Sequence, residues 1–414
     1  MKKNIKAFIK STPIYSRYYL QFGRALYDVM SINNSIHSEI VKLTENSICI
    51  DDFLGSIGRF FDDNSFMRTI QEIIRTKRED KNSYYANKND YLSYIRNADN
   101  RTLNSLQWRS LSFIANSIGM HQIGYALRAK AIEHVYESCI NSKSNYDAYL
   151  LFSAAMDQGD FETAKDVIFK KLRISKAFFK SVKMAQLYFC LVNGSINSKT
   201  LAKKHHIKED IAFADYVKGK RIAVVGPSHP IEENGSEIDT YDIIVRLNHF
   251  GKKPSKELVG SEINVSYYNG EYGETLLKMD EKEFLNELDY VVQKKPKYKL
   301  NVENVNERAS KKFDSFLFLG GFNMIPHAVL DLLMFDIKEV KIFNTNFFLS
   351  SQRYISGYPD KLVVSGIALH DATTQINLIR HLWKNGVCKV DNELENILIM
   401  SNEAIMERYE ELYP

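Results

Sequence analysis

The segment around His370 has the residue types of a general base at the start of a helix. His370 and Asp371 precede a run with helical periodicity, Ala372–Asn385, and Asp371 and Thr373 are good helix N-caps. The positive end of a helix dipole disfavours imidazolium, so a histidine there stays neutral and can accept a proton near pH 7. Asp371 is the candidate that orients the ring. The competing interpretation is a loop histidine without a chemical role.

Polar residues also stand where two predicted strands end. Gly226 ends the first strand and Ser228 follows it, while the second strand carries Arg246 and ends in Asn248. A glycine at a strand end lets backbone approach a phosphate, although Gly226 taken alone is more typical of a simple turn. Strand alternation predicts that Arg246 and Asn248 share a face. We expect Asn248 to contact a ligand and Arg246 to form a structural salt bridge with a nearby aspartate.

These candidates need a sheet to position them. Strands are expected at Lys220–Gly226, Tyr241–Asn248, Glu262–Tyr268, Leu288–Gln293, Ser315–Gly320 and Glu339–Phe343. Helices are expected at Ser255–Leu258, Lys282–Leu288, Pro326–Phe335 and Ala372–Asn385. This alternation predicts an α/β, Rossmann-like domain over residues 216–414, with a mostly parallel sheet and helices on both faces. In such a sheet, ligands bind at the carboxyl ends of the strands.

Residues 1–215 are expected to form a separate all-α domain. Asn145–Leu172 holds two helical runs split by Gln158-Gly159-Asp160, which predicts a helical hairpin of the tetratricopeptide type (TPR-like). No clean period of about 34 residues extends over the domain. The first 30 residues combine six Lys/Arg with an amphipathic pattern. Either peripheral contact with an anionic membrane or an ordinary solvated helix explains that pattern.

Composition narrows the class of protein. The 414 residues include 55 Lys+Arg and 51 Asp+Glu, a net charge of +4, which argues against a dedicated nucleic-acid binder. No stretch has the roughly 20 apolar residues of a spanning helix, and the start lacks the apolar core of a signal peptide. The four cysteines form no CxxC pair, so we expect a reducing compartment and no zinc site.

Residues 221–268 resemble the large sialyl motif of sialyltransferases, glycosyltransferase family 29. That motif runs from a Val-Val-Gly strand through a glycine and an Ile-Asp pair to an Asp-x-x-x-Arg-x-Asn strand, and then to Val-Gly-Ser. The matching residues are Val225, Gly226, Gly235, Ile238, Asp239, Asp242, Arg246, Asn248, Val259, Gly260 and Ser261. So many matches in one order over about 50 residues make the signal specific.

Two later segments continue the resemblance, which covers about residues 220–390. Asn323–Phe343 has the form of the small sialyl motif, with Gly320-Gly321 before it in place of the family's Ser/Thr-Gly. The very small motif is similar at His370, while Gln375 replaces the usual Glu. Between these segments, the resemblance suggests donor-phosphate contacts. The candidates are Arg353, Tyr354 and Tyr358.

The resemblance implies inverting transfer of an ulosonic acid from its CMP conjugate to a glycan hydroxyl, without a metal or other cofactor. Sialic acid, Kdo, and legionaminic and pseudaminic acids all remain candidate donor sugars. His370 would be the base and Asp371 its orienter. The donor would be held by Gly226, Ser228, Asn248, Asn269, Gly321, Asn323 and Tyr354.

The family's disulfide and signal-anchor are absent, and the chain is rich in Lys, Asn and Ile. We therefore expect a bacterial cytoplasmic relative, in contact with the inner membrane if the basic N-terminus binds it. Its acceptor would be a glycan or glycolipid of the capsule or lipooligosaccharide. The alternative is a catalytically degenerate CMP-binding scaffold or regulatory module, which the lost Ser/Thr-Gly favours and His370 disfavours. A dehydrogenase is excluded because the GxGxxG fingerprint is missing.

Overall fold

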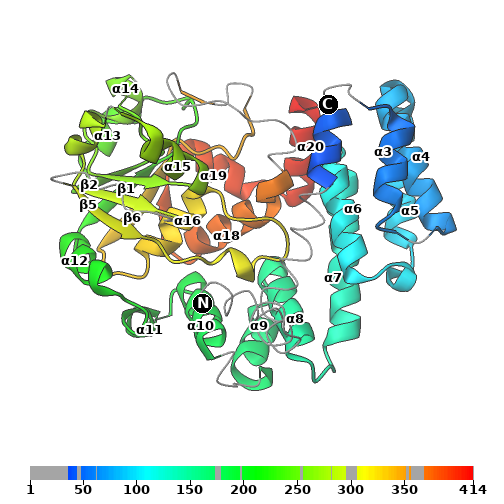
Figure 1. The fold of residues 1–414 in the computed structure, drawn as a ribbon, viewed down its shortest axis with the longest axis horizontal. Coiled ribbons are helices and arrows are strands. Elements are labelled where there is room, and N and C mark those ends of the chain that lie inside the picture. The colour runs from blue at the N-terminus through cyan, green and yellow to red at the C-terminus, as the bar shows by residue number, and fades with distance from the viewer. Residues whose placement is uncertain are drawn as a thin grey trace, which may run out of the picture.

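The computed structural model describes residues 36–43, 48–61, 63–172, 179–195, 198–251, 255–280, 282–294, 305–350, 354–355 and 368–413. The basic N-terminal segment, Arg353 and Tyr358 lie outside the described residues. The described residues before β1 form helices and their connections, and every described strand comes later in the chain (Figure 1). None of the helices in these ranges is long and apolar enough to cross a membrane.

The first half of the chain is a series of helices. After a helical stretch at 36–43 come α3 (Ile50–Gly58), α4 (Ser65–Glu79), α5 (Lys81–Asn97), η1 (Asn100–Thr102), α6 (Ser105–Ser117), α7 (His121–Cys139), α8 (Asn145–Gln158), α9 (Phe161–Asp166), the π-helix η2 (Val167–Lys171), α10 (Phe179–Val192), α11 (Ser198–Lys203) and α12 (Lys208–Val217).

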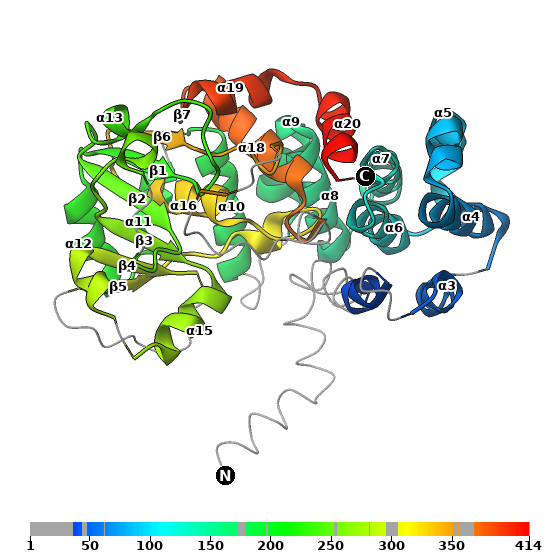
Figure 2. The same ribbon diagram turned by 90° about the horizontal axis from the view of Figure 1, so that it is seen from above.

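A helical hairpin is present at Asn145–Leu172, where the sequence predicts one, and another helical pair precedes it. Helices α6 and α7 lie side by side, joined by a short turn at Gly119 with a φ of 77° (Figures 1 and 2). Helices α8 and α9 form the hairpin predicted around Gly159, whose φ of 74° ends α8. A positive φ is easily reached by glycine, which explains these two turns. A tetratricopeptide class for these hairpins stays a prediction.

The second half contains the strands. They are β1 (Arg221–Val225), β2 (Ile243–Leu247), β3 (Val265–Tyr268), β4 (Tyr290–Gln293), β5 (Asn306–Ala309), β6 (Glu339–Phe343) and β7 (Lys389–Val390). The helices are α13 (Gly235–Ile238), α14 (Lys256–Val259), α15 (Gly270–Lys278), η3 (Glu283–Glu287), η4 (Asp314–Phe316), α16 (Met324–Leu332), α18 (Ala372–Lys384), α19 (Asn392–Ile399) and α20 (Asn402–Leu412).

The seven strands form one parallel sheet in the order β5-β4-β3-β2-β1-β6-β7, which confirms the α/β, Rossmann-like prediction. From β1 the chain proceeds outward to β5 and then returns to β6 on the other side of β1. The strand order therefore reverses beside β1. In sheets of this kind the ligand crevice lies at that reversal, over the carboxyl ends of the strands.

Alternate residues of each central strand face opposite sides of the sheet. Ile222 and Val224 of β1 belong to the main apolar core, on the side where α16 packs. Ala223 and Val225 belong to a smaller core closed by α13 and α14. Burial on both faces explains why these strands read as continuous apolar runs. A third small core lies between β3, β4, α15 and η3.

The main apolar core crosses the predicted domain boundary at residues 215–216. Trp108 of α6, Phe152 of α8 and Tyr188 of α10 belong to the same cluster as the sheet residue Ile342. The Tyr188 ring stacks on Phe316 with centroids 5.5 Å apart. The boundary stays a prediction, but the helical half and the sheet share one core.

One predicted strand is wrong and two were missed by the sequence patterns. The apolar run Ser315–Gly320 continues from η4 as a buried loop, because its Phe318 packs against Arg109 of α6 instead of another strand. Strand β5 is polar, and its Arg308 is buried between Asp210 and Asp331, residues far away in sequence. Strand β7 has only two residues, too few for a pattern.

Candidate functional site

A cavity of about 330 Å³ lies over the carboxyl ends of the central strands. It is lined by residues that follow β1, β2, β3, β4 and β6, at the reversal of strand order. The sequence predicts nine residues as the base, its orienter or donor contacts. Six of them line this cavity: Ser228, Asn248, Asn269, Asn323, Tyr354 and His370. The other three are Gly226, Gly321 and Asp371, which are not among the lining residues.

Strained backbone is concentrated at this cavity. The non-glycine residues with positive φ in the described ranges are Asn248, Asn344, Phe347, Phe348 and Asp371. Three of them line the cavity, and the other two are chain neighbours of the lining residues Thr345 and His370. Left-handed backbone costs roughly 1–2 kcal/mol per residue and tends to persist at functional sites. Its concentration here marks this cavity as the candidate site.

Asn248 and Asn269 join the ends of two neighbouring strands. Asn248 has a φ of 49°, and its Oδ1 accepts a hydrogen bond from the backbone N–H of Asn269 at 3.1 Å. The Asn269 side chain in turn caps α15 by accepting from the N–H of Tyr272 at 2.8 Å. This arrangement turns the N-terminus of α15 toward the cavity.

Arg246 does not form the predicted salt bridge. Its buried guanidinium donates to the carbonyl oxygens of Val259, Gly260 and Glu262 at 3.0–3.1 Å. Burial lowers the pKa of this guanidinium. Arg246 therefore holds the loop that follows α14 and does not line the cavity. The nearby carboxylates are engaged elsewhere, because Asp239 accepts from the N–H and hydroxyl of Ser261 and Asp242 accepts from the N–H of Arg221.

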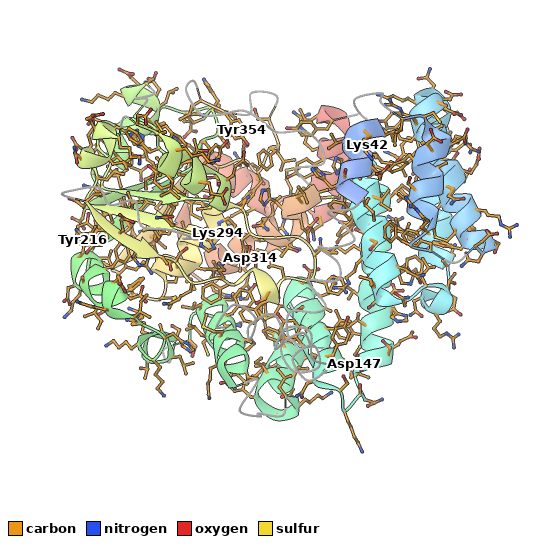
Figure 3. All side chains as sticks on the ribbon, in the orientation of Figure 1. Lys42, Asp147, Tyr216, Lys294, Asp314 and Tyr354 are labelled. Carbon is orange, nitrogen blue, oxygen red and sulfur yellow. The ribbon has the colours of Figure 1, made fainter. Side chains whose placement is uncertain are left out.

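Two features make the cavity attractive to anions. Asn323 caps α16 by accepting from the N–H of Ile325 at 3.2 Å, so a second helix begins at the cavity wall. Lys294 follows β4, lines the cavity, and donates to Asp314 at 2.9 Å and to the Phe322 carbonyl (Figure 3). Helix N-termini and an ammonium group both favour phosphate or carboxylate ligands.

Lys294 is the site residue that the sequence analysis missed. It stands directly after the apolar run Leu288–Gln293, at the same sheet edge as the other candidates. A charged residue at the end of a buried parallel strand is the signal that could have identified it. Asp314 holds the ammonium in place, and its own pKa is lowered by Lys294, which outweighs the opposing effect of burial.

His370 is held by a backbone carbonyl. Its Nδ1 lies 3.2 Å from the carbonyl oxygen of Gly321. A carbonyl can only accept, so Nδ1 carries the proton of the neutral ring and Nε2 keeps its lone pair. Burial, followed by Lys294, lowers the pKa of His370, against the opposing effects of Gly321 and Asp314. The ring is therefore neutral near pH 7, with burial rather than a helix dipole as the main cause.

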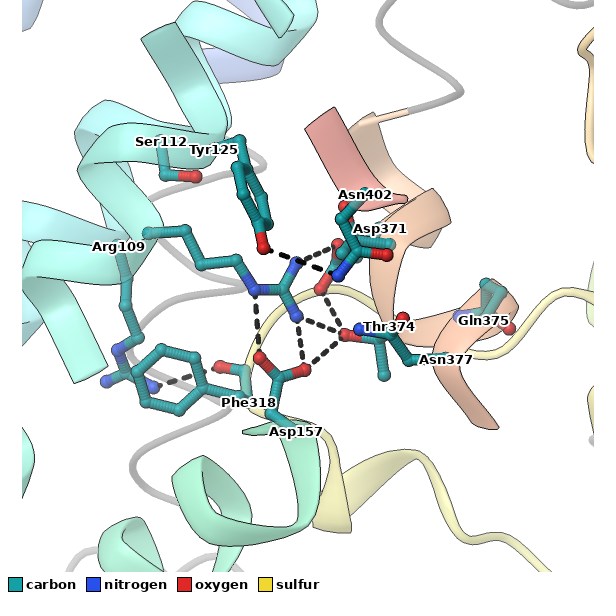
Figure 4. Close-up of polar contacts among 12 residues, drawn as sticks. Arg109, Ser112, Tyr125, Asp157, Phe318, Asp371, Thr374, Gln375, Asn377 and Asn402 are labelled. Carbon is teal, nitrogen blue, oxygen red and sulfur yellow. Dashed lines mark hydrogen bonds and ion pairs between the residues drawn. The ribbon is translucent and has the colours of Figure 1, made fainter. Parts of the chain in front are cut away.

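The Asp371 side chain makes neither of its predicted contacts: it does not cap α18 and it does not hydrogen-bond the His370 ring. It stands at the N-cap of α18, but its side chain makes no cap hydrogen bond. Its carboxylate pairs with Arg128 of α7 and with the hydroxyl of Thr374 (Figure 4). The left-handed backbone, with a φ of 47°, turns the side chain away from the cavity.

Gly226 and Gly321 serve the chain's own packing rather than ligand contact. A Cβ on Gly226 would lie 2.3 Å from the Thr345 hydroxyl, and its N–H already donates to the Phe343 carbonyl. The Gly321 N–H donates to the Leu369 carbonyl at 3.0 Å, while its own carbonyl holds His370. Neither residue lines the cavity, and the predicted donor contacts of both stay predictions.

Gln375 ties the pieces of the site together. Its side-chain amide donates to the carbonyls of His370, at 2.6 Å, and of Gly321, at 3.3 Å. Its Oε1 accepts from the N–H of Asn323 at 3.4 Å. An amide can donate and accept at once, which a carboxylate cannot. Gln375 thus connects the start of α16 to the His370 segment.

Ser228 and Tyr354 complete the polar wall. The Ser228 hydroxyl donates to Asn346 Oδ1 at 3.0 Å, which joins the loops after β1 and β6. The Tyr354 ring packs edge-on against Phe348 with centroids 6.2 Å apart. An aromatic wall opposite polar groups suits a nucleotide or sugar that has both a flat apolar face and hydrogen-bonding edges.

Other parts of the described chain are weaker candidates. A second cavity, of about 390 Å³, lies between α8, α10 and α18, away from the strand ends and without any of the nine predicted residues. The Ser310 hydroxyl lies 2.6 Å from His327 Nε2, but neither residue lines a described cavity. Among the residues described, no group of three His, Cys, Asp or Glu could hold a metal ion.

No protein-family model matches the chain, and comparison with curated proteins gives no match either. A proposed function therefore rests on the geometry of the cavity and on the sequence motifs.

Proposed function

We propose that this protein is a glycosyltransferase that moves an ulosonic acid from its CMP conjugate to a glycan hydroxyl. One observation carries the proposal. Residues selected by three separate sialyltransferase-like motifs, spread from Ser228 to His370, line a single cavity at the carboxyl edge of the sheet. That edge is where sheets of this type bind nucleotides.

The donor has two anionic groups, a phosphate and a carboxylate beside the anomeric carbon. The N-termini of α15 and α16 lie along one cavity wall and favour an anion, whereas the Lys294 charge is balanced by its ion pair with Asp314 and Glu271 also lines the cavity. Asn248, Asn269 and Ser228 would hydrogen-bond the nucleotide. Tyr354 would contact the phosphate. This anion-binding wall supports a CMP conjugate over a neutral ligand.

The proposed reaction is a displacement at the anomeric carbon. The acceptor hydroxyl gives its proton to Nε2 of His370 while its oxygen forms the new glycosidic bond. The bond from the anomeric carbon to the phosphate oxygen breaks, and CMP leaves with the electron pair. The anion-binding wall stabilises the charge that develops on the departing phosphate. Inversion at the anomeric carbon is expected from the family resemblance.

The remaining parts of the proposal follow the sequence. The acceptor would be a glycan or glycolipid of a bacterial surface polysaccharide, reached in the cytoplasm or at the inner membrane. The helical half would be a TPR-like array. The donor sugar is one of the ulosonic acids that occur as CMP conjugates.

A catalytically degenerate CMP-binding scaffold is the second candidate. The Ser/Thr-Gly of the small motif is missing, and the glycines near it pack on the chain's own backbone at Leu369 and Asp371. If the protein is a scaffold, CMP should raise its melting temperature without turnover on any acceptor. If it is an enzyme, it should release CMP from the donor.

The deciding experiment measures CMP release from a panel of CMP-ulosonates with mixed glycan acceptors, with and without EDTA. We expect release with at least one donor, unchanged by EDTA, and loss of release in His370→Gln. Calorimetry with CMP serves as the binding control. Tight CMP binding without any release selects the scaffold, and an absolute requirement for a divalent metal contradicts the metal-free mechanism.

A further inference from the structure

A buried ionic cluster connects the helical half to the residue after His370. Arg128 of α7 donates to Asp371 Oδ1 at 2.5 Å and, through Nε, to Asp157 Oδ2 of α8 at 2.9 Å. The Thr374 hydroxyl lies 2.6 Å from Asp371 Oδ2 and 2.8 Å from Asp157 Oδ1. The dashed lines around Asp157, Asp371 and Thr374 in Figure 4 mark these contacts.

Solvent has almost no access to these charges. The Arg128, Asp157 and Asp371 side chains are 2–5% exposed. Burial opposes the Arg128 charge, but Asp157 and Asp371 outweigh it and raise the pKa of the guanidinium. Displacing Asp371 would break one of the two buried ion pairs of Arg128 and the hydrogen bond from the Thr374 hydroxyl, which is unfavourable. The cluster therefore leaves the Asp371 side chain little freedom to move.

Asp371 transmits this constraint to His370 through the backbone. Its left-handed φ of 47° forms the corner between the helical residues 368–370 and α18. The Asp371 N–H also donates to the Ala368 carbonyl at 3.1 Å. A side chain tied down at this corner sets the direction in which the preceding residue, His370, projects.

The same helical hairpin holds the other side of the His370 ring. Arg109 of α6, which is 1% exposed, donates to the Phe318 carbonyl at 3.3 Å and lies over the Phe318 ring (Figure 4). Phe318 stands just before Gly320 and Gly321, and the Gly321 carbonyl accepts the His370 Nδ1 hydrogen bond. Both segments that orient the imidazole are thus anchored to α6 and α7.

We propose that the α6–α7 hairpin is a positioning element of the site, with Arg128 acting on His370 through Asp371. The helical half then contributes to the chemistry without touching substrate. This inference rests on the proposed function only where it assigns His370 the role of base. The positioning of the ring itself does not depend on that role. The Gly321 carbonyl holds the ring, and Lys294 and Asp314 are the charged groups that act on it.

The test compares full-length Asp371→Asn and Arg128→Lys with the wild type. The asparagine removes the charge on Asp371 and leaves the Arg128–Asp157 pair, so this variant is expected to fold. We expect kcat for CMP release to fall roughly 10–100-fold, the scale of a small misplacement of a catalytic group, with the donor KM within about twofold. In Arg128→Lys, kcat for CMP release should fall less than in Asp371→Asn, because the lysine can keep one of the two ion pairs.

A second readout is independent of turnover. In histidine-labelled protein, NMR follows the ring signals of His370, assigned from their loss in His370→Gln. Both variants should shift these signals and their titration midpoint. The matched control is Arg380→Lys on α18, whose guanidinium contacts the carbonyls of Leu398 and Met400 and the side chains of Asn377 and Asn402, none of them in the ionic cluster. It should leave the His370 signals unchanged.

The outcomes separate the two proposals. Folded Asp371→Asn and Arg128→Lys with wild-type His370 titration and kcat overturn the positioning role. Shifted His370 signals in a protein that releases no CMP from any donor keep the positioning role but remove the enzymatic function. If Asp371→Asn fails to fold, Arg128→Lys alone decides by the same signals.

Discussion

The Nδ1 atom of His370 lies 3.2 Å from the carbonyl oxygen of Gly321, and this contact selects which ring nitrogen carries the proton. The carbonyl accepts from Nδ1, which leaves the lone pair on Nε2 for an acceptor hydroxyl. A loop 49 residues earlier in the chain thus prepares the proposed base. The sequence predicts that task for Asp371, which instead pairs with Arg128.

Replacing His370 with alanine should abolish transfer while sparing CMP binding. A general base contributes about 10²–10⁴-fold to kcat, and the nucleotide is held by other residues. In the wild type, kcat should fall as the pH drops through the lowered pKa of His370, below 6.5. Steady-state kinetics from pH 5 to 8 would show this acid limb, and the variant's residual rate should lack it. A variant that keeps more than half of the wild-type kcat would place the base elsewhere.

Asn248→Gly and Asn248→Ala should separate binding from backbone strain. Each removes the side chain that would contact the donor, so each should weaken donor binding by about 1–3 kcal/mol. Both variants lose the hydrogen bond from the Asn269 N–H, and alanine also carries the cost of the left-handed φ, so Asn248→Ala should lower the melting temperature more than Asn248→Gly. Calorimetry with CMP and thermal melts test both parts. An unaltered donor affinity in a folded Asn248→Gly protein would make Asn248 purely structural.

Acid should destabilise the fold through buried histidines. Burial lowers the pKa of His327 to about 4, whereas the unfolded chain protonates near 6.5. Stability is therefore complete above pH 6.5 and is lost as the pH falls toward 4, by about 3 kcal/mol for this group. Urea unfolding at pH 7, 5.5 and 4.5 measures this loss. His327→Gln keeps a partner for Ser310 and should show a smaller loss, and an identical pH dependence in this variant would reject the assignment.

Asp331→Ala should destabilise the protein severely. Asp331 and Arg308 are completely buried, and Tyr267 also donates to Asp331 at 2.8 Å. Removing Asp331 takes one of two carboxylates from the buried Arg308 and leaves the Tyr267 hydroxyl without its acceptor, at a cost of about 3–5 kcal/mol. Asp336→Ala is the matched control, because the Lys199–Asp336 pair is 46% and 61% exposed and should contribute very little. Equal free energies of unfolding for the two variants would refute this reasoning.

A fragment containing residues 216–414 should be poorly soluble. The main apolar core is continuous across the cut, so the fragment exposes side chains such as Phe313 and Phe316, whose rings pack against Tyr188 of the helical half. It also leaves Asp371 without Arg128. Size-exclusion chromatography and circular dichroism would detect aggregation or loss of structure. A monomeric, fully active fragment would show that the helical half serves only partners or acceptors.

Local sequence patterns predict five of the seven described strands and most of the cavity wall. The buried strands are short apolar runs, and such runs are local signals that follow from burial on both faces. Ser228, Asn248, Asn269 and Asn323 stand at strand or helix boundaries, and parallel strands bring such boundaries to one edge. Local pattern and topology were therefore enough to predict that these residues meet.

The contacts that support the cavity wall join segments far apart in the sequence. Asp371 pairs with a residue 243 positions earlier, and Arg308 of β5 is buried because it pairs with Asp210 of α12 and Asp331 of α16. Gly226 is required by the loop after β6, not by a ligand. A buried charge is stable only beside its partner, and a close approach exists only between segments already folded together. Such pairings depend on distances that no local pattern encodes, so the sequence could predict the cavity wall but not its supports.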